Sequence, residues 1–397
     1  MLTDTKLRNL KPKDKRYKVN DRDGLYVCRT SDLGRAEANY AGRLRWRRNR
    51  YNSGKKMLMR EPMTDLSRFL AEATASGKIP GVSLAALRAG TRSAEHYFGV
   101  RGTHDRAGVD AATVFEAASL TKPLVAYIAL QLVEEGLLDL QKPLFDICGE
   151  YVSGDSNSLR ITPLHVLTHT SGLPNIVSDK APLRTYFIPG ERFSYGSSAF
   201  AWLQRAMEAV SARPLEMLAR ERVFEPLGMR HSSLEWQERF AVNHAQGHEW
   251  EGQPVPKRRV QTAQASWSLL TTASDYISFV QHVLARQGLA ATSYDQWFMP
   301  RINARQGDDA EDLVGQNPPD PNVAWGLGWG LEPFQGCFFH WGNNPGFRAL
   351  VLANRATQDA VVWFANSARG MRLIHTVVPE AVPGEHPAVE WLRIGSL

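Results

Sequence analysis

Cysteine is scarce in this chain, and its three copies, Cys28, Cys148 and Cys337, lie far apart. They form no C-x-x-C pair and no disulfide framework, which argues against a zinc finger and a small disulfide-stapled fold. No apolar run approaches the roughly 20 residues that a membrane-spanning helix needs. The basic N-terminus has no apolar stretch or small-residue cleavage site, so it does not match a secretory signal. These absences predict a reduced, cytoplasmic protein without a membrane segment.

Positive charge is confined to one end of the chain. Residues 1–60 hold 18 Lys and Arg against six Asp and Glu, whereas the remainder holds 29 against 35. The net charge of +6 therefore comes from the N-terminal segment alone. This asymmetry predicts two parts of different origin, residues 1–62 and residues 63–397.

The N-terminal part alternates short apolar runs with turn residues, in YKVND, DGLYVCRT and GRLRWRRNRYNSGKK. This alternation predicts β-strands. The segment resembles the N-terminal arm-binding domain of phage-type tyrosine recombinases (integrases), but that family's next helix and later domains have no counterpart here. We interpret residues 1–62 as a remnant or fusion, with Met57, Met59 or Met63 as alternative natural starts. DNA binding through the clustered Lys and Arg is the less favoured alternative.

The main part, from residue 63 onward, predicts a mixture of helices and strands. The patterns are a helix in TDLSRFLAEATASGK, strands in IPGVSLAALRAG and EHYFGVRG, and a helical lobe over roughly residues 125–262. Beyond residue 265, aromatic and β-branched runs predict an antiparallel sheet with a last helix, MRLIHTVVPEAV, packed on it. The acidic, Pro-rich residues 305–322 predict a surface loop. We expect a site in the cleft between the two lobes.

The stretch EAASLTKP places Ser119 and Lys122 three residues apart at the predicted start of a helix. Residues with this spacing share a helix face, so the lysine amine can reach the serine hydroxyl, and the helix N-terminus favours negative charge on the serine oxygen. Lysine with its usual pKa of about 10.4 is a poor base at neutral pH, so burial must lower that pKa. Alone the pattern is weak, because Ser53 and Lys56 repeat it in a turn of the basic segment.

Three further stretches follow the Ser119 motif in order. They are LTHTSGLP at residues 167–174, RFSYGSSAF with Tyr195 and Ser197, and CFFHWGNNPGF with His340, Trp341 and Gly342. This ordered set resembles the penicillin-recognising serine hydrolases, in the branch of class C β-lactamases, D-amino-acid peptidases and family VIII carboxylesterases. The resemblance covers roughly residues 65–395. It implies an α/β (α+β) fold of the β-lactamase/transpeptidase type, with an antiparallel sheet flanked by helices and an all-helical lobe.

The resemblance also implies a role for each matching residue. Ser119 would be the acylated nucleophile and Lys122 its base, while Tyr195 would carry a proton to the leaving group, its pKa lowered by Lys122. The backbone N–H groups of Ser119 and Asn343 would form the oxyanion hole. The substrate would contact Ser197, His340, Trp341 and Gly342. No metal or cofactor is implied.

The chain departs from the family pattern at the substrate-contacting positions. Ser197 stands where the family usually has Asn, and His340 and Trp341 replace the Lys-Thr pair of most β-lactamases. Histidine is a weaker anion anchor than lysine, and its charge would vary near pH 6.5. If His340 must be neutral to accept the substrate, kcat/KM would rise through about pH 6–7. These departures favour a less charged, more apolar acyl substrate such as a short-chain ester.

The sequence therefore predicts a serine hydrolase that cleaves ester, or amide, bonds through an acyl-enzyme on Ser119, with a family VIII-type carboxylesterase favoured. A class C-like β-lactamase and a D-amino-acid peptidase are the alternatives, and a penicillin-recognising sensor or a DNA-tethered binder is the non-enzymatic one. The expected partner is a small ester or β-lactam-like molecule. His165 and His169 share the i, i+4 spacing of zinc ligands, but a structural role is favoured. No G-x-S-x-G or H-E-x-x-H motif occurs.

Overall fold

The computed structural model describes residues 17–20, 26–29, 62–75, 77–104, 106–305 and 318–392. The chain divides into two units, Met1–Met59 and Arg60–Leu397. In the first unit, strands β1 (Tyr17–Asn20) and β2 (Tyr26–Arg29) pair antiparallel, as the alternation of YKVND and DGLYVCRT predicts. The remaining expectations for this segment, including its resemblance to a recombinase arm domain, lie outside the described residues.

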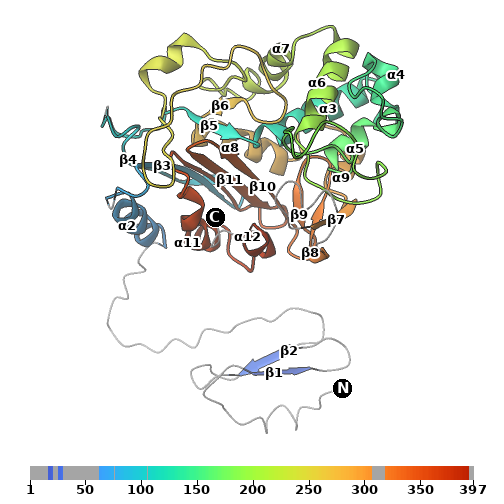
Figure 1. The fold of residues 1–397 in the computed structure, drawn as a ribbon. Coiled ribbons are helices and arrows are strands. Elements are labelled where there is room, and N and C mark those ends of the chain that lie inside the picture. Colours follow the sequence, from blue (N-terminus) through green and yellow to red (C-terminus); the bar gives the residue numbers. More distant parts are fainter. Residues whose placement is uncertain are drawn as a thin grey trace, which may run out of the picture. The chain divides into compact units, whose positions relative to one another are not determined.

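The second unit is built on an antiparallel sheet in which the described residues supply eight strands, in the order β4-β3-β12-β11-β10-β9-β8-β7 (Figure 1). The hairpin from the start of the unit thus pairs with strands from its end. The strands are β3 (Gly81–Arg88), β4 (Thr91–Gly99), β7 (Ile302–Arg305), β8 (Pro319–Trp325), β9 (Gly330–Glu332), β10 (Cys337–Asn344), β11 (Phe347–Asn354) and β12 (Ala360–Ala365). A separate pair joins β5 (Phe115–Ala118) to β6 (Leu269–Thr271). Every residue of the central strand β12 is buried, because helices cover both faces.

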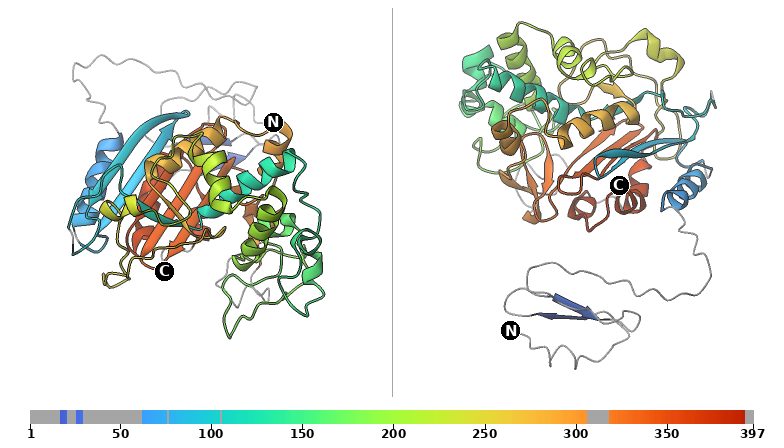
Figure 2. Two further views of the ribbon diagram at one scale, coloured as in Figure 1. Left: turned by 90° about the horizontal axis from the view of Figure 1, so that it is seen from above. Right: turned by 180° about the vertical axis from the view of Figure 1, so that it is seen from behind.

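Helices cover the two faces of the sheet differently (Figure 1). One face carries α2 (Pro62–Ala75), the turn η4 (Gly370–Leu373), α11 (Ile374–Ala381) and α12 (Pro387–Trp391). The other face carries α8 (Ala273–Leu284) and the buried side of the helical lobe. Figure 2 shows this lobe, in green, beside the orange and red strands. The predicted fold class is confirmed.

The lobe is formed by the segments between β5 and β6, together with α9. Its elements are α3 (Thr121–Glu134), α4 (Leu144–Cys148), η1 (Ser158–Arg160), α5 (Pro163–Leu167), α6 (Ser198–Ser211), α7 (Leu215–Ala219), η2 (Arg220–Phe224) and α9 (Ala291–Trp297). The short turn η3 (Glu238–Val242) also lies between β5 and β6 in the sequence, but its Phe240 packs in a separate cluster with Val114, Trp236 and Leu270. The first turns of α3 are buried on all sides, including Lys122. A helix that is apolar all round belongs in a core, and α3 lies where the lobe meets the sheet.

Three helices were not expected after residue 265: α8, α9 and α12. In α8 the apolar residues Tyr276, Phe279, Val280 and Val283 follow the helical period, and the Thr272 hydroxyl caps the helix by accepting from the backbone N–H of Asp275 at 3.0 Å. Of the expected loop at 305–322, residues 306–317 lie outside the described residues, and residues 319–322 belong to β8. None of the described helices is both long and apolar enough to cross a bilayer.

Candidate functional site

Ser119 lies in the tight turn between β5 and α3, two residues before α3 begins at Thr121. Its neighbour Ala118 has a φ of 51°, a left-handed conformation that costs a non-glycine residue about 1–2 kcal/mol. The Thr121 hydroxyl fixes this turn by donating to the Ala118 carbonyl oxygen at 2.6 Å and accepting from the Leu269 N–H at 3.0 Å. The turn leaves the Ser119 side chain partly exposed.

Lys122 is fully buried beside the serine. Its Nζ lies 3.0 Å from Oγ of Ser119 and donates to the carbonyl oxygen of Ser266 at 2.9 Å. Burial holds the pKa of Lys122 well below its usual value, because a charged amine is poorly solvated in a core. A neutral amine in this position can accept the proton of the serine hydroxyl.

Tyr195 reaches the same place from the loop before α6. Its ring stacks on His169 with 4.2 Å between ring centroids, and Nδ1 of His169 accepts from the N–H of Gly196 at 3.0 Å. The LTHTSGLP segment thus positions the tyrosine, the structural role favoured for His169. Lys122 Nζ lies 4.9 Å from the centre of the Tyr195 ring.

The pKa of Tyr195 differs from the expectation. Burial raises the pKa of the Tyr195 phenol above its usual value. The nearby Ser119 hydroxyl opposes this rise only in part, because it does not form a well-formed hydrogen bond with the phenol. Lys122 does not lower the pKa of Tyr195, because burial favours the neutral form of the lysine. Both groups therefore rest in their neutral forms.

His340, on β10, is fully buried behind the partly exposed Trp341. Its Nδ1 donates to the Trp341 carbonyl oxygen at 2.8 Å, which leaves the proton-free Nε2 buried and without a hydrogen-bond partner among the described residues. Burial lowers the pKa of His340 to about 3. The expected change of charge near pH 6.5 is therefore wrong, since burial keeps His340 neutral throughout the physiological range.

Aromatic rings surround the end of β10. The Trp341 ring lies 4.8 Å from the Tyr195 ring and 5.4 Å from that of Trp391, while Trp325 lies 5.6 Å from His340, centroid to centroid. The surface beside Tyr195 is therefore largely apolar.

Gly342 brings β10 against the segment that leads to Ser119. A Cβ atom at this position would lie 2.3 Å from the backbone oxygen of Ala117, closer than atoms can approach. Only glycine permits this contact. The next residue, Asn343, is exposed and follows directly from it.

Ser197 is engaged by a residue that sequence reasoning missed. Its hydroxyl donates to Oδ1 of Asn175 at 2.7 Å. Asn175 directly follows LTHTSGLP, and this position was its only signal in the sequence. In the family pattern an Asn two residues after the tyrosine supplies an amide. Here that position is Ser197, and the side chain of Asn175 supplies an amide beside it.

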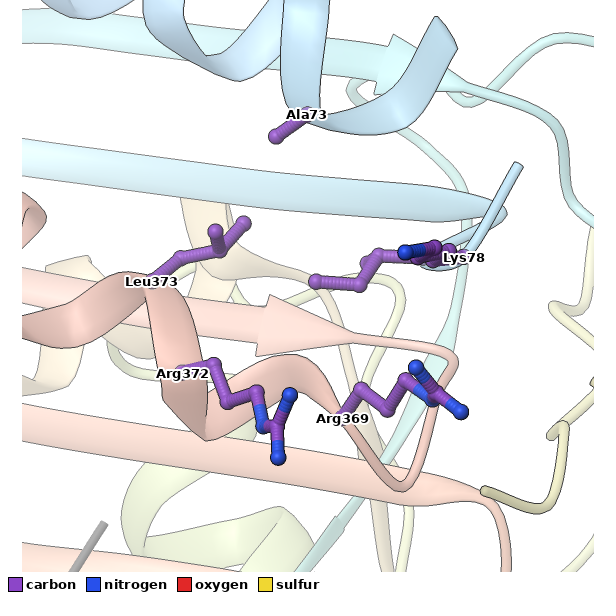
Figure 3. A pocket seen from close by; sticks show the side chains of 6 residues that line it. Ala73, Lys78, Arg369, Arg372 and Leu373 are labelled. Carbon is purple, nitrogen blue, oxygen red and sulfur yellow. The ribbon is translucent and has the colours of Figure 1, made fainter. Parts of the chain in front are cut away.

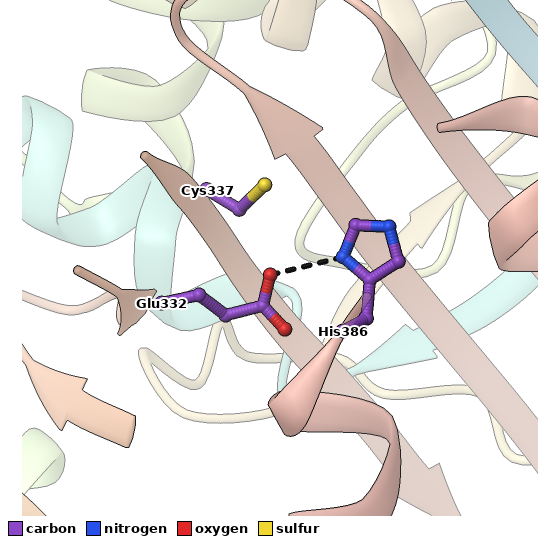
Figure 4. Close-up of side chains that lie close together, drawn as sticks. All are labelled: Glu332, Cys337 and His386. Atoms are coloured by element: carbon purple, nitrogen blue, oxygen red, sulfur yellow. Dashed lines mark hydrogen bonds and ion pairs between the residues drawn. The ribbon is translucent and has the colours of Figure 1, made fainter. Parts of the chain in front are cut away.

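A group with metal-binding chemistry lies away from Ser119. Within the described residues, ligand atoms of Glu332, Cys337 and His386 lie within 4.8 Å of one another (Figure 4). However, Nδ1 of His386 bonds to Glu332 at 3.0 Å and its Nε2 bonds to the Val382 carbonyl oxygen at 2.7 Å. An imidazole between two acceptors carries both protons, so the arrangement is a buried ion pair that ties α12 to β9.

The His386–Glu332 pair predicts a pH-dependent stability. Burial alone would lower the pKa of His386, but the bonds to Glu332 and Val382 and the charge of Glu332 outweigh it and raise the pKa. The pair therefore stabilises the fold fully below the unfolded-state pKa of about 6.5, and this contribution is lost as pH rises through the higher folded-state pKa. We expect His386→Gln to lower the free energy of unfolding more at pH 6 than at pH 9, measured by urea denaturation. The exposed His375 provides the control: if His375→Gln shows the same pH dependence, the assignment to His386 is wrong.

The hollow near α2 and η4 is separate from these residues. It measures about 190 Å³ and is lined by Ala73, Lys78, Ile79, Arg369, Arg372 and Leu373 (Figure 3). None of the predicted site residues lines it.

Known proteins resemble this chain over most of its length. Residues 66–375 match the family model described as Beta-lactamase. A beta-lactamase of Yersinia enterocolitica is 24% identical over 326 residues, which cover 77% of this chain and 81% of that protein. The putative penicillin-binding protein PbpX of Bacillus subtilis (strain 168) is 23% identical over 66% of this chain, and the match spans 64% of PbpX. The solved structure of a class C beta-lactamase superposes with a TM-score of 0.68 at 18% identity, covering 84% of this chain and 99% of that one.

Proposed function

Because the chain belongs to the beta-lactamase family of serine hydrolases, we propose that it cleaves carboxylic esters through a covalent acyl-enzyme on Ser119. The observation that carries this proposal is the 3.0 Å contact between Ser119 Oγ and the buried amine of Lys122. A serine becomes nucleophilic when an adjacent base takes its proton, and a lysine can do so once its pKa is lowered.

The proposed reaction follows from the resting protonation states. Neutral Lys122 takes the proton of Ser119 as Oγ attacks the ester carbonyl, and the N–H groups of Ser119 and Asn343 stabilise the oxyanion. The tetrahedral intermediate collapses as the phenol of Tyr195 gives its proton to the leaving alcohol oxygen, and Tyr195 is reprotonated by Lys122. In the second half, water loses a proton to the same pair of groups while it attacks the acyl-enzyme. The carboxylic acid then leaves, and Oγ regains its proton.

The favoured substrate class rests on the surroundings of Tyr195. A buried, neutral His340 offers no fixed positive charge for a substrate carboxylate, and the neighbouring Trp341 is a large apolar surface. Apolar pockets with few polar groups select uncharged ligands. This favours a short-chain ester as the substrate and Ser197 with Asn175 as the polar contact beside it.

A β-lactamase is the second candidate, favoured by the names of the Yersinia relative and of the class C structure. A D-amino-acid peptidase uses the same chemistry on an amide. A penicillin-recognising sensor would stop at the acyl-enzyme.

The test combines turnover with intact-protein mass spectrometry of wild type and Ser119→Ala. We expect the wild type to hydrolyse p-nitrophenyl butyrate and Ser119→Ala to lose at least about 10³-fold in kcat/KM, since removing the nucleophile abolishes acylation. A cephalosporin should leave a lasting mass adduct on wild type alone. Rapid cephalosporin turnover without an adduct would instead identify a β-lactamase, and a stable ester adduct without turnover would identify a sensor. Equal activity of wild type and Ser119→Ala would contradict the proposal.

The burial of His340 predicts the pH dependence of the ester reaction. With a pKa of about 3, His340 does not change charge between pH 5 and 8, so it contributes no step to kcat/KM in that range. We expect wild type and His340→Gln to share the same profile midpoints, whatever their absolute rates. A midpoint near pH 6.5 that disappears in His340→Gln would show that the histidine titrates.

A further inference from the structure

We propose that Glu116 is a positioning residue for acyl transfer. It fixes two segments relative to Ser119: the end of β10, which carries Asn343, and the loop whose Ser266 carbonyl oxygen accepts from Lys122. This inference rests on the proposed function of the same site. Glu116 lies on β5, three residues before the nucleophile, and is only 5% exposed. A buried carboxylate is costly unless donors compensate it, so its partners indicate what it holds.

Two donors meet the same carboxylate oxygen of Glu116. The side-chain amide of Asn344 donates to Oε2 at 2.8 Å, and the guanidinium of Arg258 forms an ion pair with the same atom. Asn344 is the last residue of β10 and directly follows Asn343. The hydrogen bond that Asn344 donates to Glu116 therefore fixes the end of the strand that carries the proposed oxyanion donor.

The network extends to the loop beside Lys122. The Asn344 amide also lies 3.5 Å from the carbonyl oxygen of Trp267, and the Arg258 guanidinium lies 4.9 Å from the centre of the Trp267 ring. Trp267 follows Ser266, whose carbonyl oxygen accepts from Lys122. One carboxylate thus joins three segments: the strand before the nucleophile, the strand end at the oxyanion hole and the loop at the base.

Charge at position 116 matters because one of its two donors is the Arg258 guanidinium. A carboxylate forms stronger, charge-assisted bonds than an amide, and only it can pair with the guanidinium. Glutamine would preserve the volume and one acceptor but weaken both contacts. The three segments would then lose their common anchor while the core around them stays intact.

The test compares Glu116→Gln with a matched control, Glu216→Gln. Glu216 is also a largely buried carboxylate, accepting from the Ser233 hydroxyl at 2.8 Å and the Leu234 N–H at 2.6 Å, with no contact to the site residues. We expect Glu116→Gln to slow single-turnover acylation by p-nitrophenyl butyrate about 10- to 100-fold. The ester concentration that half-saturates this reaction should stay nearly unchanged, because small misplacements of reacting groups lower the rate and not the binding. Glu216→Gln should keep the wild-type acylation rate.

A double-variant cycle separates positioning from general destabilisation. If Glu116 acts through Asn344, then Glu116→Gln combined with Asn344→Ala should be no slower than the slower single variant. Thermal melts and titration of active sites with a slow-release ester normalise each rate to folded enzyme. The inference is overturned if Glu116→Gln acylates at the wild-type rate, or if Glu216→Gln loses as much. A wild type no faster than Ser119→Ala would overturn the proposed function itself, and this inference with it.

Discussion

Gly342→Ala is expected to abolish most of the ester hydrolysis while the protein still folds. The added methyl group would lie 2.3 Å from the backbone oxygen of Ala117, so β10 must move away from the Ser119 turn. That movement separates the proposed oxyanion donors, Asn343 and Ser119. Loss of one such donor typically costs about 10²–10³-fold in kcat, and we expect a loss of this size.

Gly108→Ala is the matched control for this prediction. A Cβ at Gly108 meets no atom within 4 Å, and its φ is not positive, so alanine fits there without strain. Steady-state kinetics should show wild-type rates for Gly108→Ala, and circular dichroism should show that both variants are folded. If Gly342→Ala retains full kcat, the close approach of β10 and β5 is not needed for the reaction.

Lys122→Met is expected to lower kcat by about 10²–10⁴-fold, the usual contribution of a general base. Methionine matches the length of the lysine stem but cannot take the serine proton. Lys122→Arg should fail as well, because a guanidinium stays protonated at all accessible pH values. In wild type, kcat/KM should rise with pH through the lowered pKa of Lys122 and level off well below pH 10.5.

Lys122→Met is expected to lower activity but not stability. The unfolded chain carries a charged Lys122 at neutral pH, whereas the folded state holds it neutral, so the unfolded state binds more protons and wild-type stability falls as pH falls. Lys122→Met removes this penalty. We expect its urea midpoint to match or exceed that of wild type, with a larger gain at pH 6 than at pH 9. A variant that loses both activity and stability would show that the lysine is mainly structural.

Local spacing was enough to identify several parts of the site. Ser119 and Lys122 are three residues apart and lie 3.0 Å from each other in the structure, because a helix start places such residues together whatever surrounds them. The strands of β3, β10, β11 and β12 followed from their β-branched and aromatic runs. In contrast, the sequence patterns considered above predict no helix at α8, although its apolar residues keep the helical period and Thr272 marks its start.

Charge states were the main point on which sequence reasoning was incomplete. An exposed histidine would titrate near pH 6.5, and a charged lysine would lower the pKa of a nearby phenol. Burial reverses both expectations: His340 is neutral, and Tyr195 has a raised pKa beside a neutral Lys122. Desolvation depends on every segment packed around a group, and these segments are distant in the chain.

Which residues can do the chemistry, and their order along the chain, can be recognised without the structure. The ordered motifs specify a serine with a lysine base, a tyrosine and a strand motif, and these depend on local backbone geometry. The folded structure is needed to see which of these groups are neutral, which glycine allows two strands to touch, and that Asn175 bonds to Ser197 and Glu116 to Asn344. These properties arise from burial and from contacts between segments far apart in sequence, which no local pattern encodes.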